Sequence, residues 1–288
     1  MPRFASLLAL CACACACACV FAFGTLAKAE TQPQERRPSH CIALVENTPG
    51  IRVHRASFAE ALGEYTIGIH YIGHAMFLIA TPGGTTVVTD YSGFLGASDF
   101  VPDVATMNRA HSTHWTPYPD PRIPHVLPGW GKDGAPAGHY LDLGDMLIRS
   151  VSTDIRSWGA EGVNGNSIFV FEAEGLCIGH LGHLHHEPTA EQYAALGRLD
   201  VVMAPVDGGM TLDLPRMIGV LKRLRSSVVI PMHWFGTGSL AVFLDGMRDE
   251  FAIERVDGPS LMVSLRDLPD RPTIKLLRPQ MLRSDDTP

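Results

Sequence analysis

The fold is decided by residues 65–90, which read YTIGIHYIGHAMFLIATPGGTTVVTD. Apolar and polar residues alternate from Tyr65 to Ala80, which is the pattern of a half-buried β-strand. The turn sequence Thr81-Pro-Gly-Gly84 then reverses the chain into a second β-rich run at 85–90. This stretch predicts a β-hairpin at the start of the folded domain.

Four further apolar runs end at or just before side chains that can bind a metal ion. The runs are 101–107, 146–153, 176–179 and 228–232, and they lead to His111 and His114, to Asp154, to His180 and His183, and to His233. Binding sites in α/β proteins are built at strand ends. We therefore expect these side chains to contribute to one site.

Two helices are expected between the last two of these runs. Thr189-Ala-Glu-Gln192 is a capping box, and 211–224 places apolar side chains on one stripe. Because strand-forming runs both precede and follow the two helices, the sequence predicts an α/β domain. We place this domain at 61–268, between an N-terminal leader segment at 30–60 and a C-terminal tail at 269–288.

Residues 1–29 have the order of a secretory signal peptide. Arg3 precedes a long apolar run, and Ala27-Lys28-Ala29 matches an A-x-A cleavage site. A membrane anchor is the alternative interpretation of the apolar run. We expect export to the periplasm or secretion, with no stable membrane insertion after cleavage.

Cysteine content and charge narrow the function classes. Five of the seven cysteines lie in the signal segment, which leaves Cys41 and Cys177 as a disulfide pair or as buried thiols. Without Arg3 and Lys28, 21 basic residues stand against 30 acidic ones, a formal charge of −9. This excess argues against nucleic acid and anionic membranes as partners. The expected partner is a small-molecule substrate. The oligomeric state stays open.

Histidines carry the chemical signal. Four of the thirteen fall within residues 180–186, which read HLGHLHH. Imidazole is a common zinc ligand, and His-rich tracts are candidate metal sites. A zinc ion takes only about four or five ligands, so we expect His185 and His186 to be solvated loop residues.

Five segments, taken in order, resemble landmarks of the metallo-β-lactamase superfamily, in particular its UlaG-like branch. These segments are 71–79, 87–90, 102–107, 179–182 and 230–233. The resemblance implies a four-layer αββα sandwich, in which two β-sheets pack back to back with helices outside. It also implies a metal site at one edge, in loops that follow strands.

The metal motif departs from the family pattern H-x-H-x-D-H. The matching stretch is 109–114, in which Arg109 replaces the first histidine and Thr113 replaces the aspartate. By the same resemblance, Asp154 matches the next ligand position, His183 matches a bridging aspartate, and His233 matches the final histidine. Loss of carboxylates and gain of a guanidinium favour one metal ion over two.

The resemblance therefore implies a single ion held by His111, His114, His183 and His233. We expect zinc, although other divalent transition metals would fit. Catalytic roles are assigned to His183 and Asp154, the latter as a further ligand or as a general base. Four more residues are expected to orient ligands or contact the substrate: His74, Asp90, Arg109 and His180. Asp90 could instead cap a turn, and Arg109 could instead form a structural salt bridge.

The expected function is hydrolysis of an ester, lactone or phosphoester by a metal-activated water. The rival is a non-catalytic metal- or ligand-binding protein on the same fold. Neither a G-x-S-x-G elbow nor a G-x-x-x-x-G-K loop occurs in the sequence. Two segments keep two interpretations each: 115–139 is a lid or irregular structure over the sheet, and 207–209 lines the site or forms a tight turn.

Overall fold

The computed structural model describes residues 36–42, 62–156 and 162–284. The predicted signal peptide and most of the predicted leader lie outside these residues. The chain divides into two compact units, Met1–Arg36 and Arg37–Pro288, and the fold below is that of the second unit. None of the helices in the described ranges is both long enough and apolar enough to cross a membrane.

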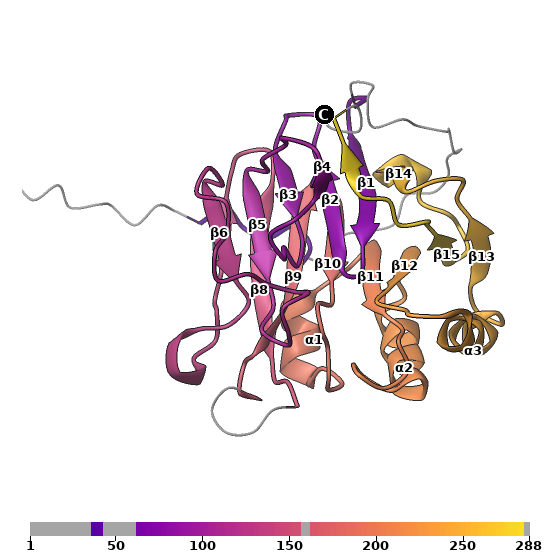
Figure 1. The fold of residues 1–288 in the computed structure, drawn as a ribbon. Helices are drawn as coiled ribbons and strands as arrows, with labels where there is room; N and C mark the ends of the chain where they lie inside the picture. Colours follow the sequence, from indigo (N-terminus) through magenta and orange to yellow (C-terminus); the bar gives the residue numbers. More distant parts are fainter. Residues whose placement is uncertain (1–35, 43–61, 157–161, 285–288) are drawn as a thin grey trace, which may run out of the picture. The chain divides into compact units, whose positions relative to one another are not determined.

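Two large β-sheets form most of the described part of the domain (Figure 1). The six-stranded sheet has the order β14-β1-β2-β3-β5-β6, with strands at Ser260–Ser264, Thr66–Gly73, Met76–Ala80, Thr86–Val88, Val104–Met107 and His125–Pro128. The eight-stranded sheet has the order β13-β15-β12-β11-β10-β9-β8-β7, with strands at Ala252–Arg255, Thr273–Leu276, Val228–Met232, Val201–Pro205, Leu176–His180, Asn166–Ala173, Leu147–Thr153 and Tyr140–Asp142.

The remaining elements are short. The helices are α1 (Ala190–Leu196), α2 (Leu214–Leu224) and α3 (Thr237–Met247), and 3-10 turns occupy Lys132–Gly134 and Leu265–Asp267. Strands β4 (Gly96–Ala97) and β16 (Leu282–Arg283) pair with each other in parallel.

The two sheets stack through one apolar core. Phe77 of the six-stranded sheet and Phe169 and Ile230 of the eight-stranded sheet are fully buried members of it. The outer face of the eight-stranded sheet carries the helices, where Met217 of α2 and Phe243 of α3 pack with strand residues. This arrangement confirms the predicted α/β class and the packed pair of sheets.

Loop segments cover the outer face of the six-stranded sheet. Trp115 and Trp130 pack against this face, with their rings edge to face at 5.8 Å. In the same stretch Tyr118 is 86 % exposed. The two tryptophans therefore belong to irregular structure packed over the sheet, which was one of the two interpretations of this segment.

The run predicted as one strand at 65–80 is two antiparallel strands. The chain reverses between β1 and β2 at Gly73 and His74, whose φ angles are 157° and 55°. Glycine tolerates a positive φ freely, and histidine is one of the side chains that adopts it more often than most. The following run forms β3, antiparallel to β2, as the predicted hairpin requires.

The helix predictions hold in part. Thr189 caps α1 in the predicted capping box with Gln192. The second helix begins at Leu214 rather than Thr211, because the Asp213 carboxylate accepts a hydrogen bond from the Arg216 backbone N–H and caps it there. Helix α3 was not predicted.

Two structural features lie in the segments expected to flank the domain. Residues 273–276 form β15 in the interior of the eight-stranded sheet, between β12 and β13, rather than a peripheral tail. The Pro-, Asp- and Arg-rich residues before this strand concealed its short apolar pattern. Cys41, from the predicted leader, forms a disulfide with Cys177 of β10.

Candidate metal centre

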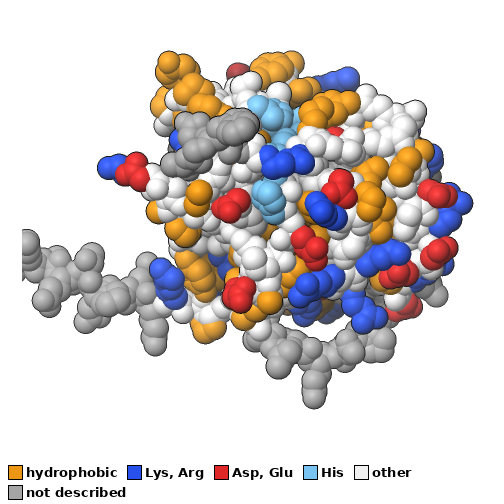
Figure 2. Space-filling model, turned by 90° about the horizontal axis from the view of Figure 1, so that it is seen from below, with side chains coloured by type: hydrophobic (Ala, Val, Ile, Leu, Met, Phe, Trp, Pro, Cys, Tyr) orange, Lys and Arg blue, Asp and Glu red, His pale blue; other side chains and the backbone are white. Residues whose placement is uncertain are grey.

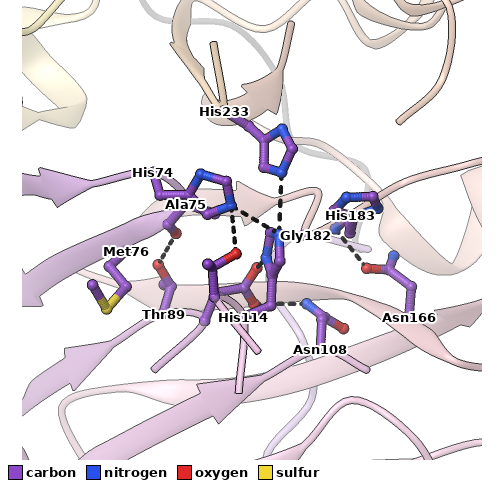
Figure 3. A network of polar contacts seen from close by, with 12 residues as sticks. His74, Ala75, Met76, Thr89, Asn108, His114, Asn166, Gly182, His183 and His233 are labelled. Atoms are coloured by element: carbon purple, nitrogen blue, oxygen red, sulfur yellow. Dashed lines mark hydrogen bonds and ion pairs between the residues drawn. The ribbon is translucent and has the colours of Figure 1, made fainter. Parts of the chain in front are cut away.

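Turns and loops at the ends of four strands bring five histidines together. His74 lies in the β1–β2 turn, His111 and His114 follow β5, His183 follows β10, and His233 follows β12. Ligand nitrogens of His74, His111, His114 and His233 all lie within 4.8 Å of one another. Figure 3 shows His74 and His233 pointing toward His114, with His183 beside them.

His114 is the centre of the cluster. Its Nε2 lies 3.2 Å from the Nε2 of His74 and 3.2 Å from the Nε2 of His233. On the far side of each ring, His114 Nδ1 lies 2.5 Å from Asp90 Oδ2, and His233 Nδ1 lies 3.0 Å from Asp207 Oδ2. A carboxylate accepts hydrogen bonds, so the Nδ1 atoms carry the protons. The Nε2 atoms of His114 and His233 therefore face each other with lone pairs, which repel unless a cation lies between them.

These nitrogens fit a zinc ion. Zinc binds imidazole nitrogen at about 2.0–2.1 Å in a tetrahedral shell, which places two ligand nitrogens about 3.3 Å apart. Both contacts of His114 Nε2 are 3.2 Å. A carboxylate behind a ligand imidazole fixes its tautomer, as it does in zinc proteins generally.

Asp90 is locked behind His114. Asn108 Nδ2 donates to Asp90 Oδ1 at 2.8 Å, and Asn108 Oδ1 accepts the backbone N–H of Ser167 at 2.7 Å. Burial raises the pKa of Asp90 to about 6. Asp90 thus lies where it orients the imidazole of His114. Asn108 was missed, although it directly follows β5 in the sequence.

Asp207 has the matching position behind His233. It accepts hydrogen bonds from the Thr211 hydroxyl and from the backbone N–H groups of Gly209 and Met210. Burial would raise the pKa of Asp207, but these hydrogen bonds and that of His233 lower it well below its usual range. The segment 207–209 therefore supports the site through a turn, which combines the two interpretations given to it.

A second pair of imidazoles lies next to the first group. His111 Nε2 and His183 Nε2 are 3.2 Å apart, and His183 Nδ1 lies 2.9 Å from His185 Nε2. His185 is 8 % exposed and accepts the backbone N–H of Arg156, so the expectation that it is solvated is wrong. His186 is exposed as expected.

Burial keeps these imidazoles neutral. Desolvation, followed by repulsion from His233, lowers the pKa of His74 to about 3 and that of His114 far below its ordinary value. Desolvation also lowers the pKa of His111, of His183 and, to about 4, of His185. A neutral imidazole is the form that binds metal ions.

Three site residues hold backbone conformations that are uncommon outside glycine. His74, Asp90 and His233 have φ angles of 55°, 44° and 55°. The His233 N–H donates to the His74 carbonyl at 2.9 Å, and the Tyr71 hydroxyl donates to the same carbonyl at 2.8 Å. Such strained backbone gathers at functional sites, where the surrounding structure enforces it.

The other predicted residues lie apart from the ligand nitrogens. His180 is fully buried and donates from Nε2 to the Ala75 carbonyl at 2.8 Å, so it supports the β1–β2 turn. Asp154 is exposed and accepts the Asn164 backbone N–H at 2.8 Å. Among the described residues, no contact joins Asp154 to the histidine cluster, and its catalytic role stays a prediction.

A family model described as beta-lactamase superfamily domain matches residues 68–233. The chain belongs to this superfamily. One similar solved structure is a proposed Zn-dependent hydrolase of the metallo-beta-lactamase superfamily from Thermotoga maritima. It shares 26 % identity over 74 % of this chain and 100 % of that one, with a TM-score of 0.55.

A metallo hydrolase of Ignicoccus hospitalis shows the same fold at 18 % identity, over 69 % of this chain and 99 % of that one, with a TM-score of 0.51. None of the curated proteins compared with the chain matches it. Membership of the beta-lactamase superfamily is thus established, and placement in the UlaG-like branch stays a prediction.

The two residues that depart from the family motif both lie beside the histidine cluster. Thr113, at the aspartate position, places its Oγ1 2.8 Å from His74 Nε2 and 2.8 Å from His111 Nδ1. His74 therefore supplies a nitrogen next to the position where the superfamily motif has a carboxylate. Arg109, at the first histidine position, lines a pocket beside His111 and His183.

Proposed function

We propose that this member of the beta-lactamase superfamily is a metal-dependent hydrolase that uses one zinc ion. The observation that carries the proposal is the 3.2 Å contact between the Nε2 atoms of His114 and His233, with Asp90 and Asp207 behind the two rings. Two buried imidazoles held in this way form half of a zinc site. The likeness to the Thermotoga maritima protein supports the same activity.

We further propose that His74, His114 and His233 are the three protein ligands. Both 3.2 Å contacts of this group share His114 Nε2, whereas His111 Nε2 makes its 3.2 Å contact with His183. This set differs from the sequence-based one by including His74 and by giving His111 and His183 another role. Three nitrogen ligands leave one position for water, as in catalytic zinc sites.

Zinc bound by these residues supplies a Lewis acid that lowers the pKa of water to about 7. We assign the proton transfers of the reaction to His111 and His183. His185 Nδ1 accepts the Arg156 backbone N–H, so His185 Nε2–H donates to His183 Nδ1. The neutral His183 ring therefore carries its own hydrogen on Nε2, which faces the Nε2 atom of His111 at 3.2 Å. His111 Nε2 is therefore placed to take a proton from the attacking water, and His183 Nε2 to donate its hydrogen to the leaving group.

A single ion agrees with the charge of the site. The two buried carboxylates, Asp90 and Asp207, offset the charge of one divalent ion. Arg109 adds a positive charge on the side of His111 and His183, where a second cation would be repelled. The proposed substrates are an ester, a lactone or a phosphoester.

We also propose export of the protein to the periplasm or beyond, as the signal segment predicts. The disulfide between Cys41 and Cys177 supports this location, because disulfides persist in oxidising compartments.

Hydrolysis assays on the full mature chain test the proposed function. The substrates are 4-nitrophenyl acetate, a γ-lactone and bis(4-nitrophenyl) phosphate. We expect turnover of at least one, its loss on chelation and its return with one equivalent of zinc, whereas His114→Ala/His233→Ala stays inactive with zinc. Tight zinc binding without turnover of any of the three would favour the non-catalytic metal-binding protein.

A further inference from the structure

An open pocket of about 330 Å³ lies beside the histidine cluster, and its lining is basic. Its lining includes Arg109, Arg156, His111, His183 and His185. No carboxylate lines it within the described part of the chain. Figure 2 shows the pale blue histidines on this face with a basic side chain between them.

The two arginines of the pocket differ in how they are held. Arg156 donates from one guanidinium nitrogen to the carbonyls of Gly209, Met210 and Thr211 at 2.7–2.9 Å, which fixes it as part of the wall. The Arg109 guanidinium lies 5.6 Å from the centre of the Trp130 ring. Among the described residues it forms no ion pair or hydrogen bond, so its donors are available to a ligand.

The nearest buried carboxylates of the site do not neutralise this pocket. Asp90 is occupied by His114 and Asn108, and Asp207 by His233, Thr211 and backbone N–H groups. Both lie behind the rings that they orient, on the far side from the ligand nitrogens. Positive charge on Arg109 and Arg156 is therefore without an acidic partner in the pocket.

We propose that this pocket binds an oxyanion group of the substrate, a carboxylate or a phosphate, through the Arg109 guanidinium. A guanidinium presents parallel N–H donors that match either group in a two-point contact. His111 and His183 lie between the pocket and the pair His114 and His233. The anionic group would therefore bind on one side of His111 and His183, and the bond to be cleaved would lie on the other side. This inference rests on the proposed hydrolase function, whose substrate it narrows to an anionic ester, lactone or phosphoester.

Anion binding to the zinc-loaded mature chain tests this proposal. Inorganic phosphate and succinate are titrated by calorimetry at fixed ionic strength into the wild type, Arg109→Gln and Arg109→Lys. Arg278→Gln is the matched control, because Arg278 is 77 % exposed and pairs with Asp257 away from the pocket. Zinc content and melting temperature are measured for each variant.

We expect binding of at least one of the two anions and an affinity at least about tenfold lower in Arg109→Gln, at unchanged zinc content. Arg109→Lys should fall between these two, because lysine keeps the charge and loses the two-point contact. Arg278→Gln should bind as the wild type does. The better of the two anions identifies the substrate group as phosphate or carboxylate.

Equal affinity in Arg109→Gln and the wild type would overturn the proposal, because the zinc ion alone would then hold the anion. Binding of neither anion would overturn it as well. The assay with neutral 4-nitrophenyl acetate separates this outcome from failure of the proposed function, since that ester has no anionic group for Arg109 to hold.

Discussion

His114 and His233 present their Nε2 atoms to each other at 3.2 Å, while a buried carboxylate holds the Nδ1 proton of each ring. This relationship favours a cation at the point where the two lone pairs meet, because two facing lone pairs repel each other. It also assigns a separate function to Asp90 and Asp207, which orient the imidazoles rather than bind the ion. The predictions below follow from this arrangement.

Replacing Asp90 with asparagine should weaken zinc binding by about 10–100-fold, because the acceptor that fixes the His114 tautomer is lost. Competition with a chromogenic chelator measures the affinity. Asp257→Asn is the control, since the Asp257 side chain is 84 % exposed and pairs with Arg278 rather than with a histidine of the site. An unchanged affinity in Asp90→Asn would mean that His114 is not a ligand.

His74→Ala and His183→Ala should have different effects, because His74 is proposed to bind the metal ion and His183 to transfer protons. We expect His74→Ala to weaken zinc binding by more than about 100-fold, beyond the effect of an orienting residue. His183→Ala should keep its zinc and lose about 100-fold or more in turnover, as removal of a general acid–base does. The reverse pattern would favour the ligand set His111, His114, His183 and His233.

Acid should destabilise the metal-free protein from about pH 6.5 downward. Six histidines of the site have a lowered pKa: His74, His111, His114, His180, His183 and His185. Below pH 6.5 the unfolded chain takes up protons that the folded chain does not, so the free energy of unfolding falls as the pH falls. For His74 this contribution is lost between about pH 6.5 and its folded pKa of about 3.

Asp90 has the opposite effect on the free energy of unfolding, because its folded pKa of about 6 lies above the unfolded value near 3.8. Its contribution rises as the pH falls between these values, and six histidines outweigh one carboxylate. Urea unfolding at pH 7.5, 6.5, 5.5 and 4.5 measures the net slope, about 1.4 kcal/mol per pH unit for each proton. A free energy of unfolding independent of pH over this range would show that the histidines are not buried in the folded protein.

Replacing Cys41 and Cys177 together with serine should lower the free energy of unfolding by about 2–5 kcal/mol, because the bond closes a loop with a sequence separation of 136 residues. Denaturant unfolding of the variant, and of the wild type with and without reductant, measures the loss. Zinc content should stay the same, since Cys177 belongs to β10 and His183 follows its far end. An unchanged unfolding midpoint in both comparisons would mean that the bond is absent in solution.

Much of the fold followed from local pattern. Alternation, turn residues and the capping box at Thr189 marked the strands and α1, because these signals act over a few residues. The β1–β2 turn was missed because Gly73 is the only usual turn residue at this point, and it interrupts an apolar run without a second turn residue beside it. Strand β15 was missed because four residues give too short a pattern between polar flanks.

The site could be predicted only in part. His111, His114, His183 and His233 were found by their places after strands and by resemblance to a known motif. His74 as a proposed ligand, and Asn108 and His185 as neighbours, needed the three-dimensional structure, because contacts across 40, 59 and 29 residues, respectively, set their positions. No sequence signal gave the direction of the Asp154 side chain, which contacts Asn164 instead of the cluster.

Metal content tests the central claim most directly. The mature chain, purified without a His tag, and the His114→Ala/His233→Ala variant are analysed by inductively coupled plasma mass spectrometry after equilibration with zinc and removal of free ion. The account predicts about one zinc ion per wild-type chain and none in the variant. Absence of stoichiometric metal from the wild type, even after reconstitution with zinc, iron or manganese, would contradict it.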